Sequence, residues 1–450
     1  MKRFSPYIVV FLLLCLFLAI KIPHLSIRFS DTNVYFYEGY KILHGAKIYK
    51  DILFTNLPMW GYVSAAYVFL TGGSLTSFFF ISKLEVCITA LFLFLIAKKK
   101  TENSWAQITA PAVYLFSTAM LATSEHQTGV FFAILGAVAS YYFSLIKRPI
   151  LSGICAAIGF TTKAYTLPLL AALGIHYLIF ERKLIVKFIA GFTATFAAIV
   201  GPSLIIAPQE MYKQLIGYSL VRQAGVSKEN VFMFFILNDP LIFILGIYSL
   251  SLVKKYTYVL LSIVFSLVFL LAYTDVYYLY LTMFVPAAAL AAAALITDLS
   301  MYKKHAATAA MVIVAAVASF NIYHYTITFS QLGTIPNLKK LVTTIQQHKP
   351  DQLYGADSIT PALAYLSGVP LHNNMIDTNL NFYNAGIYSA FDQTKLALTK
   401  KTIFVSPAFS GQLTSGIIDS DVIQGRCKKL ESVPFLSEGG DDSIVLLKCF

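Results

Sequence analysis

Residues 7–20 read YIVVFLLLCLFLAI, and a few residues later the chain continues as RFSDTNVYFYEGYKILHGAKIYKD, residues 28–51. The first stretch is apolar enough to form a helix that enters a lipid bilayer. The second carries three carboxylates, Asp31, Glu38 and Asp51. This part of the sequence therefore predicts a membrane span that is followed at once by an acidic segment at the membrane surface.

The composition of the whole chain indicates a polytopic membrane protein. Of its 450 residues, 57% are hydrophobic and only 12% are charged, and the mean hydropathy is +0.69. The net charge of +12 does not indicate a nucleic-acid partner, because Lys and Arg gather in short clusters between apolar runs. This distribution is typical of the positive-inside rule, with the lipid bilayer as the main surrounding medium. The clusters are KR at 2–3, KKK at 98–100, KR at 147–148, ERK at 181–183, KK at 254–255 and KK at 303–304.

These clusters define the predicted topology, because two loops on one side of the membrane must be separated by an even number of crossings. One interval, residues 149–180, is short: each half has only about 15 residues, whereas a full span needs about 20. The halves meet at GFTTKAYTLP, residues 159–168, which predicts two short helices and a polar hinge that opens towards the far side. Interrupted helices in a membrane need protein or water around the freed backbone groups, so we expect a cavity at this hinge.

The pattern predicts an all-α polytopic membrane protein with about eleven transmembrane helices and a small C-terminal α/β domain. The transmembrane part covers residues 1–329, with a first outer loop at 23–75, and residues 330–450 form the extracytoplasmic domain. A cleaved signal peptide is the alternative for the first apolar run; the absence of a small-residue cleavage motif and its pairing with a span at 76–97 favour a span. A cytoplasmic N-terminus and an outer C-terminal domain fit a bacterial inner membrane, and an endoplasmic reticulum membrane satisfies the same physics.

The predicted outer domain combines short β-like runs with one helical segment. QLYGAD, KTIFVSP and SIVLLKCF are typical of strands, TPALAYLSG of a helix that ends at a glycine, and VPLHNNMIDTNLNFYNAG of a long loop. Cys427 and Cys449 lie in this domain, where an oxidising compartment permits a disulfide; two buried thiols are the alternative. The sequence contains no CxxC or HExxH metal motif.

Two polar groups near the predicted outer surface are candidates for chemistry. On a helix that begins near Thr32, Asp31, Tyr35 and Glu38 share one side. A carboxylate at the mouth of an apolar cavity can act as a base, although SDTN is equally suitable as a helix N-cap. Glu125 and His126, in TSEHQTG, are expected at the same membrane face, where a polar cluster at a helix start is the simpler interpretation.

Three cations are expected on the outer side, against the positive-inside bias. They are Lys163 in the hinge, and Lys213 and Arg222 in a later outer loop. Such cations can hold a phosphate group by charge-assisted hydrogen bonds. The alternative is that their side chains extend to the lipid head groups.

The sequence resembles the polytopic GT-C glycosyltransferases, especially the superfamily of protein mannosyltransferases and aminoarabinose transferase-like enzymes. The resemblance is carried by DTNVYFYEGYKILHGAKIYKDILFTNLPMWGY, where Asp31 matches the family's acidic position and Gly45, Tyr49 and Asp51 match its "G…Y.D" positions. It continues at Glu125, at GICAAIGFTTK, which ends in Lys163, and weakly at YYLYLTMFVPAAALAAA.

The resemblance implies sugar transfer from a polyprenyl-phosphate carrier to a hydroxyl group of a cell-envelope glycan, lipid or protein, with inversion at the anomeric carbon. It implies that Asp31 is the general base and that Lys163, helped by Arg222 and Lys213, stabilises the departing phosphate. Glu125 would orient the acceptor or bind a divalent cation together with Asp31. The expected contacts to the acceptor or the sugar are Tyr35, Glu38, Tyr49, Asp51 and His126.

Two other classes of function compete with this interpretation. A lipid or polysaccharide-precursor transporter, or flippase, usually carries ionisable groups near the middle of the bilayer. The acidic residues here gather near one surface, but Lys83 and Glu85 do fall inside the second predicted span. A non-catalytic membrane scaffold explains the outer domain but not the interrupted helix pair.

Overall fold

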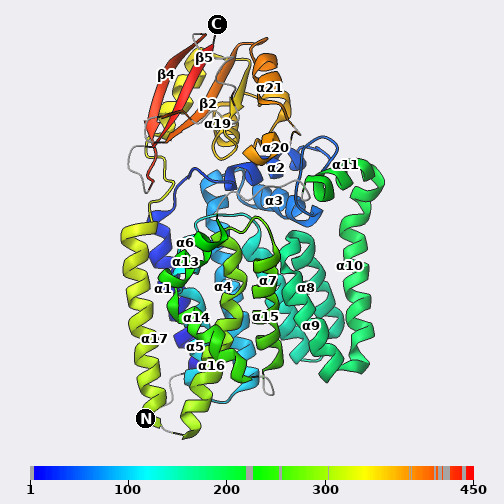
Figure 1. Cartoon of the computed structure of the whole chain (residues 1–450), viewed down its shortest axis with the longest axis vertical. Coiled ribbons are helices and arrows are strands. Elements are labelled where there is room, and N and C mark those ends of the chain that lie inside the picture. Colours follow the sequence, from blue (N-terminus) through cyan, green and yellow to red (C-terminus); the bar gives the residue numbers. More distant parts are fainter. Residues whose placement is uncertain are drawn as a thin grey trace.

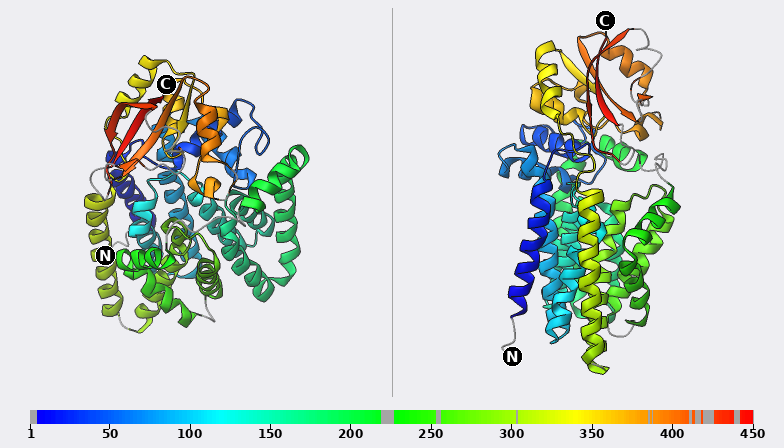
Figure 2. Two further views of the ribbon diagram at one scale, coloured as in Figure 1. Left: turned by 45° about the horizontal axis from the view of Figure 1, so that its top comes forward. Right: turned by 90° about the vertical axis from the view of Figure 1, so that its left-hand side faces the viewer.

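The computed structural model consists of a bundle of apolar helices with a small α/β domain at one end (Figure 1). The structure describes residues 5–218, 227–252, 256–302, 304–384, 386, 388–409, 412, 413, 418, 426–437 and 442–449. The N-terminus lies at the end of the bundle opposite to the α/β domain, which carries the C-terminus (Figures 1 and 2). This arrangement has the helical bundle and the C-terminal α/β domain that the sequence predicts.

The first two predicted spans, residues 7–20 and 76–97, fall on helices of the bundle. Among the described residues, five helical segments are long and apolar enough to cross a membrane, or six if one bent pair counts as a span. The other apolar helices are shorter. The bundle helices are α1 (Pro6–Lys21), α4 (Leu75–Lys100), α5 (Ser104–Leu115), α7 (Val130–Leu145), α8 (Pro149–Thr162), α9 (Leu167–Phe180), α10 (Ile185–Ile206), α13 (Lys228–Asn238), α14 (Pro240–Tyr248), α15 (Thr257–Ala272), α16 (Val285–Tyr302) and α17 (Lys304–His324).

Two of the predicted spans are interrupted, which the apolar runs did not show. Residues 231–252 are an apolar run that the predicted topology counts as one span; they lie in α13, α14 and the turn that follows, and the two parts meet at an angle of 94°. Pro240 begins α14 and Asp239 precedes it, with its carboxylate accepting hydrogen bonds from the backbone N–H groups of Thr118 and Ala119. These two residues begin α6 (Thr118–Thr123), a short helix that follows a break after α5. The carboxylate thus satisfies helix N-terminal donors that would otherwise lie unpaired in the bundle.

The short helices α8 and α9 form the hairpin that residues 149–180 predict. α8 packs closely against α7, where a Cβ atom on Gly159 would lie 2.8 Å from the carbonyl oxygen of Ala133. On the facing helix, a Cβ atom on Gly136 would lie 2.8 Å from Cα of Gly159. Small residues let membrane helices approach backbone to backbone, and here they position the hinge that follows α8. Lys163 is the first residue of that hinge and has an extended backbone.

The C-terminal domain is built on one mixed sheet covered on both faces. Its strand order is β1-β2-β5-β4, with β1 parallel to β2, the other pairs antiparallel, and β3 added to β2. Helices α18 (Leu338–His348) and α19 (Thr360–Ser367) share one apolar core with the sheet, and α21 (Ala390–Ala397) shares the other. The strands are β1 (Gln352–Gly355), β2 (Thr402–Phe409), β3 (Gln412–Leu413), β4 (Cys427–Pro434) and β5 (Ser443–Cys449).

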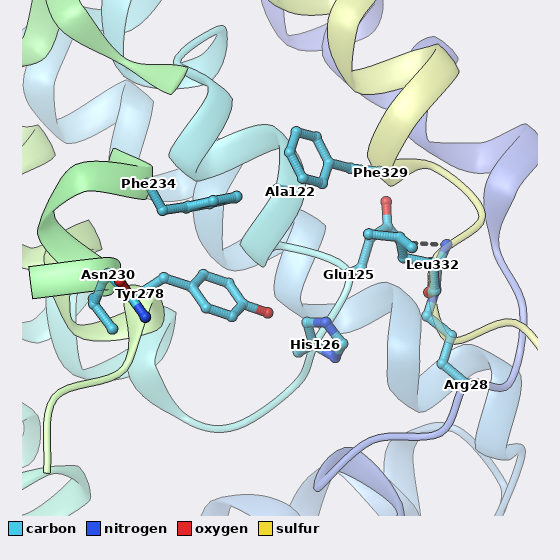
Figure 3. Close-up of a pocket in the computed structure, with 10 residues that line it drawn as sticks. Arg28, Ala122, Glu125, His126, Asn230, Phe234, Tyr278, Phe329 and Leu332 are labelled. Atoms are coloured by element: carbon cyan, nitrogen blue, oxygen red, sulfur yellow. Dashed lines mark hydrogen bonds and ion pairs between the residues drawn. The ribbon is translucent and has the colours of Figure 1, made fainter. Parts of the chain in front are cut away.

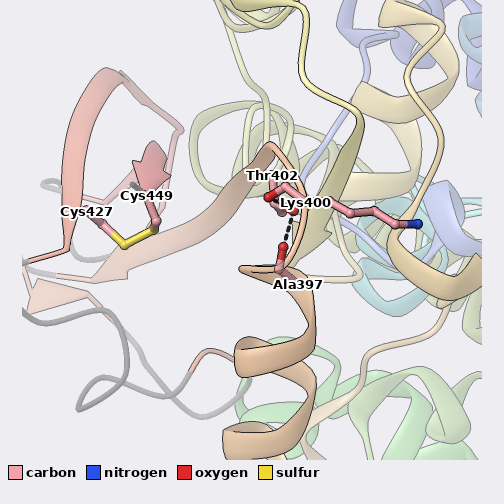
Figure 4. The surroundings of a disulfide bond; sticks show 5 residues. All are labelled: Ala397, Lys400, Thr402, Cys427 and Cys449. Carbon is pink, nitrogen blue, oxygen red and sulfur yellow. Dashed lines mark hydrogen bonds between the residues drawn. A yellow bond between two sulfur atoms is a disulfide. The ribbon is translucent and has the colours of Figure 1, made fainter.

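The sequence does not predict strand β4, because its residues, CKKLESVP, are largely polar. The strand lies at the edge of the sheet, where polar residues can face water. Its first residue, Cys427, is paired with Cys449 of β5 and forms a disulfide with it (Figure 4). Of the two alternatives left open by the sequence, the structure therefore has the disulfide. The bond ties an edge strand to its neighbour.

Between the bundle and the α/β domain lie two surface helices, α2 (Thr32–Leu43) and α3 (Pro58–Leu70) (Figure 1). Apolar residues of α2 and α3 belong to the same core as α18, α19 and the sheet. The amide of Asn33 donates to the carbonyl oxygen of Ser358 at 2.5 Å, and the backbone N–H of Ser30 donates to the same oxygen at 2.9 Å. The α/β domain is thus attached directly to the turn that carries Asp31.

Candidate functional site

The largest of the described cavities, about 830 Å³, lies where the helix hairpin, the start of α2 and the α/β domain meet. Its walls combine aromatic rings with a small set of polar and charged groups. The polar and charged lining residues are Ser30, Asp31, Thr55, Asn56, His126, Thr128, Lys163, Asp357, Ser358, Asp377 and Asn379, and the tyrosines are Tyr35, Tyr165, Tyr218, Tyr273, Tyr277, Tyr278 and Tyr280. The cavity that the interrupted helix pair predicts is present at the hinge.

Asp31 lies at the mouth of this cavity. It occupies the N-cap position of α2, but its side chain makes no capping hydrogen bond. The side chain is exposed and lines the cavity. The geometry therefore favours a role at the cavity over the simpler role of a helix cap.

Lys163 reaches the same cavity from the hinge between α8 and α9. Its ammonium group lies 2.6 Å from Oδ1 of Asn56 and 3.3 Å from the hydroxyl of Tyr35, and it lies over the Tyr35 ring at 4.7 Å from the centroid. Only 4% of the residue is exposed. Asn56 and Tyr35 orient the ammonium group at the cavity wall, where a cation can form charge-assisted hydrogen bonds to an anion.

Glu38 lies one helical turn beyond Tyr35 on α2 and is 2% exposed. Its Oε2 atom has no hydrogen-bond partner within the described residues. Burial raises the pKa of Glu38 well above its usual range, and the nearby carboxylates of Asp377 and Asp31 add to the rise, whereas Lys163 opposes it. This environment favours the protonated form of Glu38, which is not among the cavity's lining residues.

Three other predicted site residues lie away from the cavity walls. Tyr49 is buried, and its hydroxyl donates to the carbonyl oxygen of Asn56 at 2.6 Å, so it supports the loop that holds Lys163. Asp51 is exposed and accepts from the backbone N–H of Lys47 at 2.8 Å. Lys213 is exposed on the π-helical turn η4 (Lys213–Gly217), and Arg222 lies outside the described residues.

Glu125 belongs to a buried ion cluster rather than to the large cavity. Its carboxylate pairs with Lys21, with Arg28 at 3.2 Å and with Lys83 at 3.2 Å, and it accepts a hydrogen bond from the hydroxyl of Tyr325. Lys21 ends α1, Arg28 precedes α2, Lys83 lies in α4, and Tyr325 begins the π-helical turn η7 (Tyr325–Phe329). The cluster thus joins segments that are far apart in the sequence.

A second cavity of about 340 Å³ lies beside this cluster (Figure 3). Arg28 and Glu125 form one side of it, and the rings of Phe234 and Tyr278 lie on the other. His126 and Tyr278 line both cavities. Nδ1 of His126 forms a hydrogen bond with the Ser30 hydroxyl, and the two atoms are 2.8 Å apart. His126 thus connects the loop that carries Glu125 to the turn that carries Asp31.

The sequence did not identify Asn56, Asp357 and Asp377 as site residues. Asn56 stands in the motif that carries the family resemblance, two residues before Pro58, and that position was the available signal. Asp357 follows β1, and Asp377 lies in the predicted long loop. No local pattern marks these two aspartates, because their place at the cavity depends on how the α/β domain meets α2.

The residues present do not fit a divalent cation shared by Asp31 and Glu125. Both oxygens of the Glu125 carboxylate face cations. Within the described part of the chain, no group of three His, Cys, Asp or Glu side chains is arranged to hold a metal ion. We therefore assign no step to a metal.

No protein-family model and no curated sequence matches the chain. Solved structures do match its fold. ArnT from Cupriavidus metallidurans, bound to undecaprenyl phosphate, has a TM-score of 0.65 at 12% identity, with 97% of each chain covered. The oligosaccharyltransferase AglB from Archaeoglobus fulgidus, in complex with an inhibitory peptide and a dolichol-phosphate, has a TM-score of 0.52 at 10% identity, covering 90% of this chain and 69% of that one.

The arabinofuranosyltransferase AftD from Mycobacteria has a TM-score of 0.61 at 12% identity; the match covers all of this chain and 40% of AftD. These neighbours are GT-C glycosyltransferases. At such low identity the likeness shows the fold alone. The chain has a GT-C-like fold with a small C-terminal sheet domain, as the sequence resemblance implies.

Proposed function

We propose that this polytopic GT-C-like membrane protein is a glycosyltransferase that moves a sugar from a polyprenyl-phosphate carrier to an acceptor hydroxyl group. The observation that carries the proposal is the meeting of Asp31 and Lys163 at one cavity. One is an acid at the start of α2 and the other is a cation in the hinge of the α8–α9 pair. The lipid phosphates in the ArnT and AglB structures support the same class of donor.

In the proposed reaction Asp31 is the general base. Its carboxylate takes the proton of the acceptor hydroxyl as that oxygen attacks the anomeric carbon of the sugar. The bond between this carbon and the phosphate oxygen breaks on the opposite side, so the configuration inverts and polyprenyl phosphate leaves. General base catalysis of this kind contributes about 10²- to 10⁴-fold to a rate.

Lys163 is the residue proposed to face the departing phosphate. Negative charge grows on the phosphate oxygens as the bond to the sugar breaks, and a positioned cation stabilises it most in the transition state. Asn56 and Tyr35 hold the ammonium group in place, so it need not reorganise during the reaction. Lys213 lies away from the cavity walls, and we assign it no direct contact with the donor.

We place the reaction on the extracytoplasmic face of a bacterial inner membrane. The Cys427–Cys449 disulfide supports an oxidising compartment for the α/β domain. At the other end of the bundle Lys99, Lys100 and Lys147 line a common pocket, which fits the lysine-rich cytoplasmic side. The acceptor is a glycan, lipid or protein of the cell envelope.

Lys83 and Glu85 are the residues that favour the transporter alternative in the sequence. Both lie in α4 and have partners within the protein. Lys83 pairs with Glu125, and Glu85 accepts hydrogen bonds from Tyr67 at 2.8 Å and Gln127 at 3.0 Å. These contacts give both residues a role in packing the bundle.

The test of the proposed class uses the purified full-length protein with a panel of radiolabelled polyprenyl-phosphate monosaccharides and a membrane extract as acceptor. We expect label to move from at least one donor to an acceptor. A parallel assay in vesicles follows movement of the same labelled lipids across the bilayer. If the labelled lipids cross the bilayer but no donor gives up its sugar, the protein is a flippase and the proposed transferase function is wrong.

A further inference from the structure

The α/β domain contributes two carboxyl groups to the wall of the large cavity. Asp357 follows strand β1, and Asp377 lies between η8 (His372–Asn374) and α20 (Leu380–Asn384). The hydroxyl of Thr378 donates to the carbonyl oxygen of Gly355 at 2.6 Å, so the segment with Asp377 is fixed to the end of β1 beside Asp357. The end of β1 and the loop fixed to it therefore present the two carboxyl groups together.

This pair lies on the same side of the cavity as Asp31. The carbonyl oxygen of Ser358, next to Asp357, accepts hydrogen bonds from Ser30 and Asn33, which flank Asp31. Asp31 and Asp377 both act electrostatically on Asp357, and burial together with these two charges raises the pKa of Asp357 well above its usual range. The groups are thus close enough to repel one another when they are charged.

Neighbouring carboxylates repel one another, and a proton held by one of them lowers that repulsion. Asp357 accepts hydrogen bonds from the backbone N–H of Ser358 at 2.7 Å and from the hydroxyl of the same residue at 3.1 Å. A carboxyl pair that holds one proton can both donate to and accept from hydroxyl groups, which matches an uncharged polyol better than an anion.

We propose that Asp357 and Asp377 bind hydroxyl groups of a carbohydrate acceptor and so make the α/β domain the acceptor-specificity element of the site. This inference rests on the proposed transferase function. It assigns the pair to the acceptor because the two groups lie beside the base, whereas Lys163 marks the donor phosphate. The tyrosines of the same cavity offer ring faces for a sugar.

The test measures sugar binding first, because binding does not depend on turnover. Neutral methyl hexosides and a methyl hexosaminide are the probes, and their binding to the full-length protein in detergent micelles is followed by saturation-transfer NMR and titration. The variants are Asp357→Asn and Asp377→Asn. The matched control is Asp392→Asn, an exposed aspartate of the same domain that does not line the cavity.

We expect a neutral hexoside to bind the wild type and the control equally and each cavity variant at least about tenfold more weakly. The melting temperature of Asp357→Asn should stay equal to the wild-type value or rise, because the change removes repulsion, whereas a purely structural residue would lose stability. Equal binding by all four proteins, or binding of the hexosaminide alone, would overturn the proposal.

A second measurement separates this inference from the proposed function. In the transfer assay we expect the half-saturating acceptor concentration to rise in both cavity variants while that of the lipid donor stays unchanged. A rise for the donor instead would overturn the assignment to the acceptor. The wild type could also transfer no sugar at all while the cavity variants still lose hexoside binding. That result would contradict the proposed transferase function but would support a carbohydrate site at Asp357 and Asp377.

Discussion

At the residue scale, Glu38 is a buried acid whose charge state links the site to stability. The pKa of Glu38 is raised well above its usual range by burial and by Asp377 and Asp31. In the unfolded chain the same carboxyl loses its proton near pH 4, at a pKa of about 4.3. As the pH rises from there, only the unfolded state ionises, so Glu38 lowers the free energy of unfolding until the folded-state pKa is reached.

Glu38→Gln removes this ionisation without a large change in shape. We expect the melting temperature of the variant, relative to wild type, to increase as the pH rises from about 4 to 8. Thermal unfolding of both purified proteins across this pH range measures the difference, with the exposed Glu102→Gln as control. A difference that stays constant or shrinks with pH would show that Glu38 is charged in the folded protein.

Lys163 is expected to act on the donor. Lys163→Gln keeps much of the length of the side chain but removes its charge, so it loses a charge-assisted contact to phosphate of about 1.5–3 kcal/mol. We expect kcat/KM for the lipid donor to fall about 10- to 100-fold. Steady-state transfer at varied donor concentration measures this, with exposed Lys339→Gln of α18 as control. Equal kcat/KM values in both variants would remove Lys163 from the mechanism.

At the element scale, the packing of α8 against α7 determines where the hinge lies. Gly159→Ala places a Cβ atom 2.8 Å from the Ala133 carbonyl oxygen, so the two helices must separate. Overpacking of this kind costs about 1–3 kcal/mol. Lys163 lies one turn further along, so the same change should also lower kcat/KM for the donor. Thermal unfolding and the transfer assay measure the two effects.

The matched control is Gly174→Ala in α9, where an added Cβ atom meets nothing within 4 Å. Alanine is the better helix former by about 0.5–1 kcal/mol, so this variant should be as stable as wild type or more stable. If both alanine variants unfold at the wild-type temperature, close packing of α8 and α7 does not position the hinge.

At the scale of the whole molecule, the Glu125 cluster joins α1, α4, the loop after α6 and η7. Glu125→Gln leaves Lys21, Arg28 and Lys83 without the carboxylate that they share. Removing one partner of a buried ion pair costs about 3–5 kcal/mol. We expect a large fall in melting temperature and a proportionate loss of folded protein, with Glu102→Gln unchanged. A variant with wild-type stability that has lost transfer would show instead that Glu125 takes part in catalysis.

The sequence predicts the helices well, because a membrane span is a local property of about 20 residues. It also predicts that Asp31 and the hinge with Lys163 reach one cavity, since both follow from topology. It does not predict the break at Asp239, where the carboxylate caps α6 from a distant part of the chain. Nor does it predict Arg28 beside Glu125, or Asp357 and Asp377 at the cavity. Each of these depends on contacts between segments far apart in the sequence.

The most direct test of the account compares wild type with Asp31→Asn in sugar transfer and in binding of the lipid donor. If Asp31 is the base, the variant binds the donor as wild type does and melts at a similar temperature. Its rate constant for transfer then falls about 10²- to 10⁴-fold. Transfer at the wild-type rate by the well-folded variant would contradict this account. Asp31 would then have only a structural role at the start of α2.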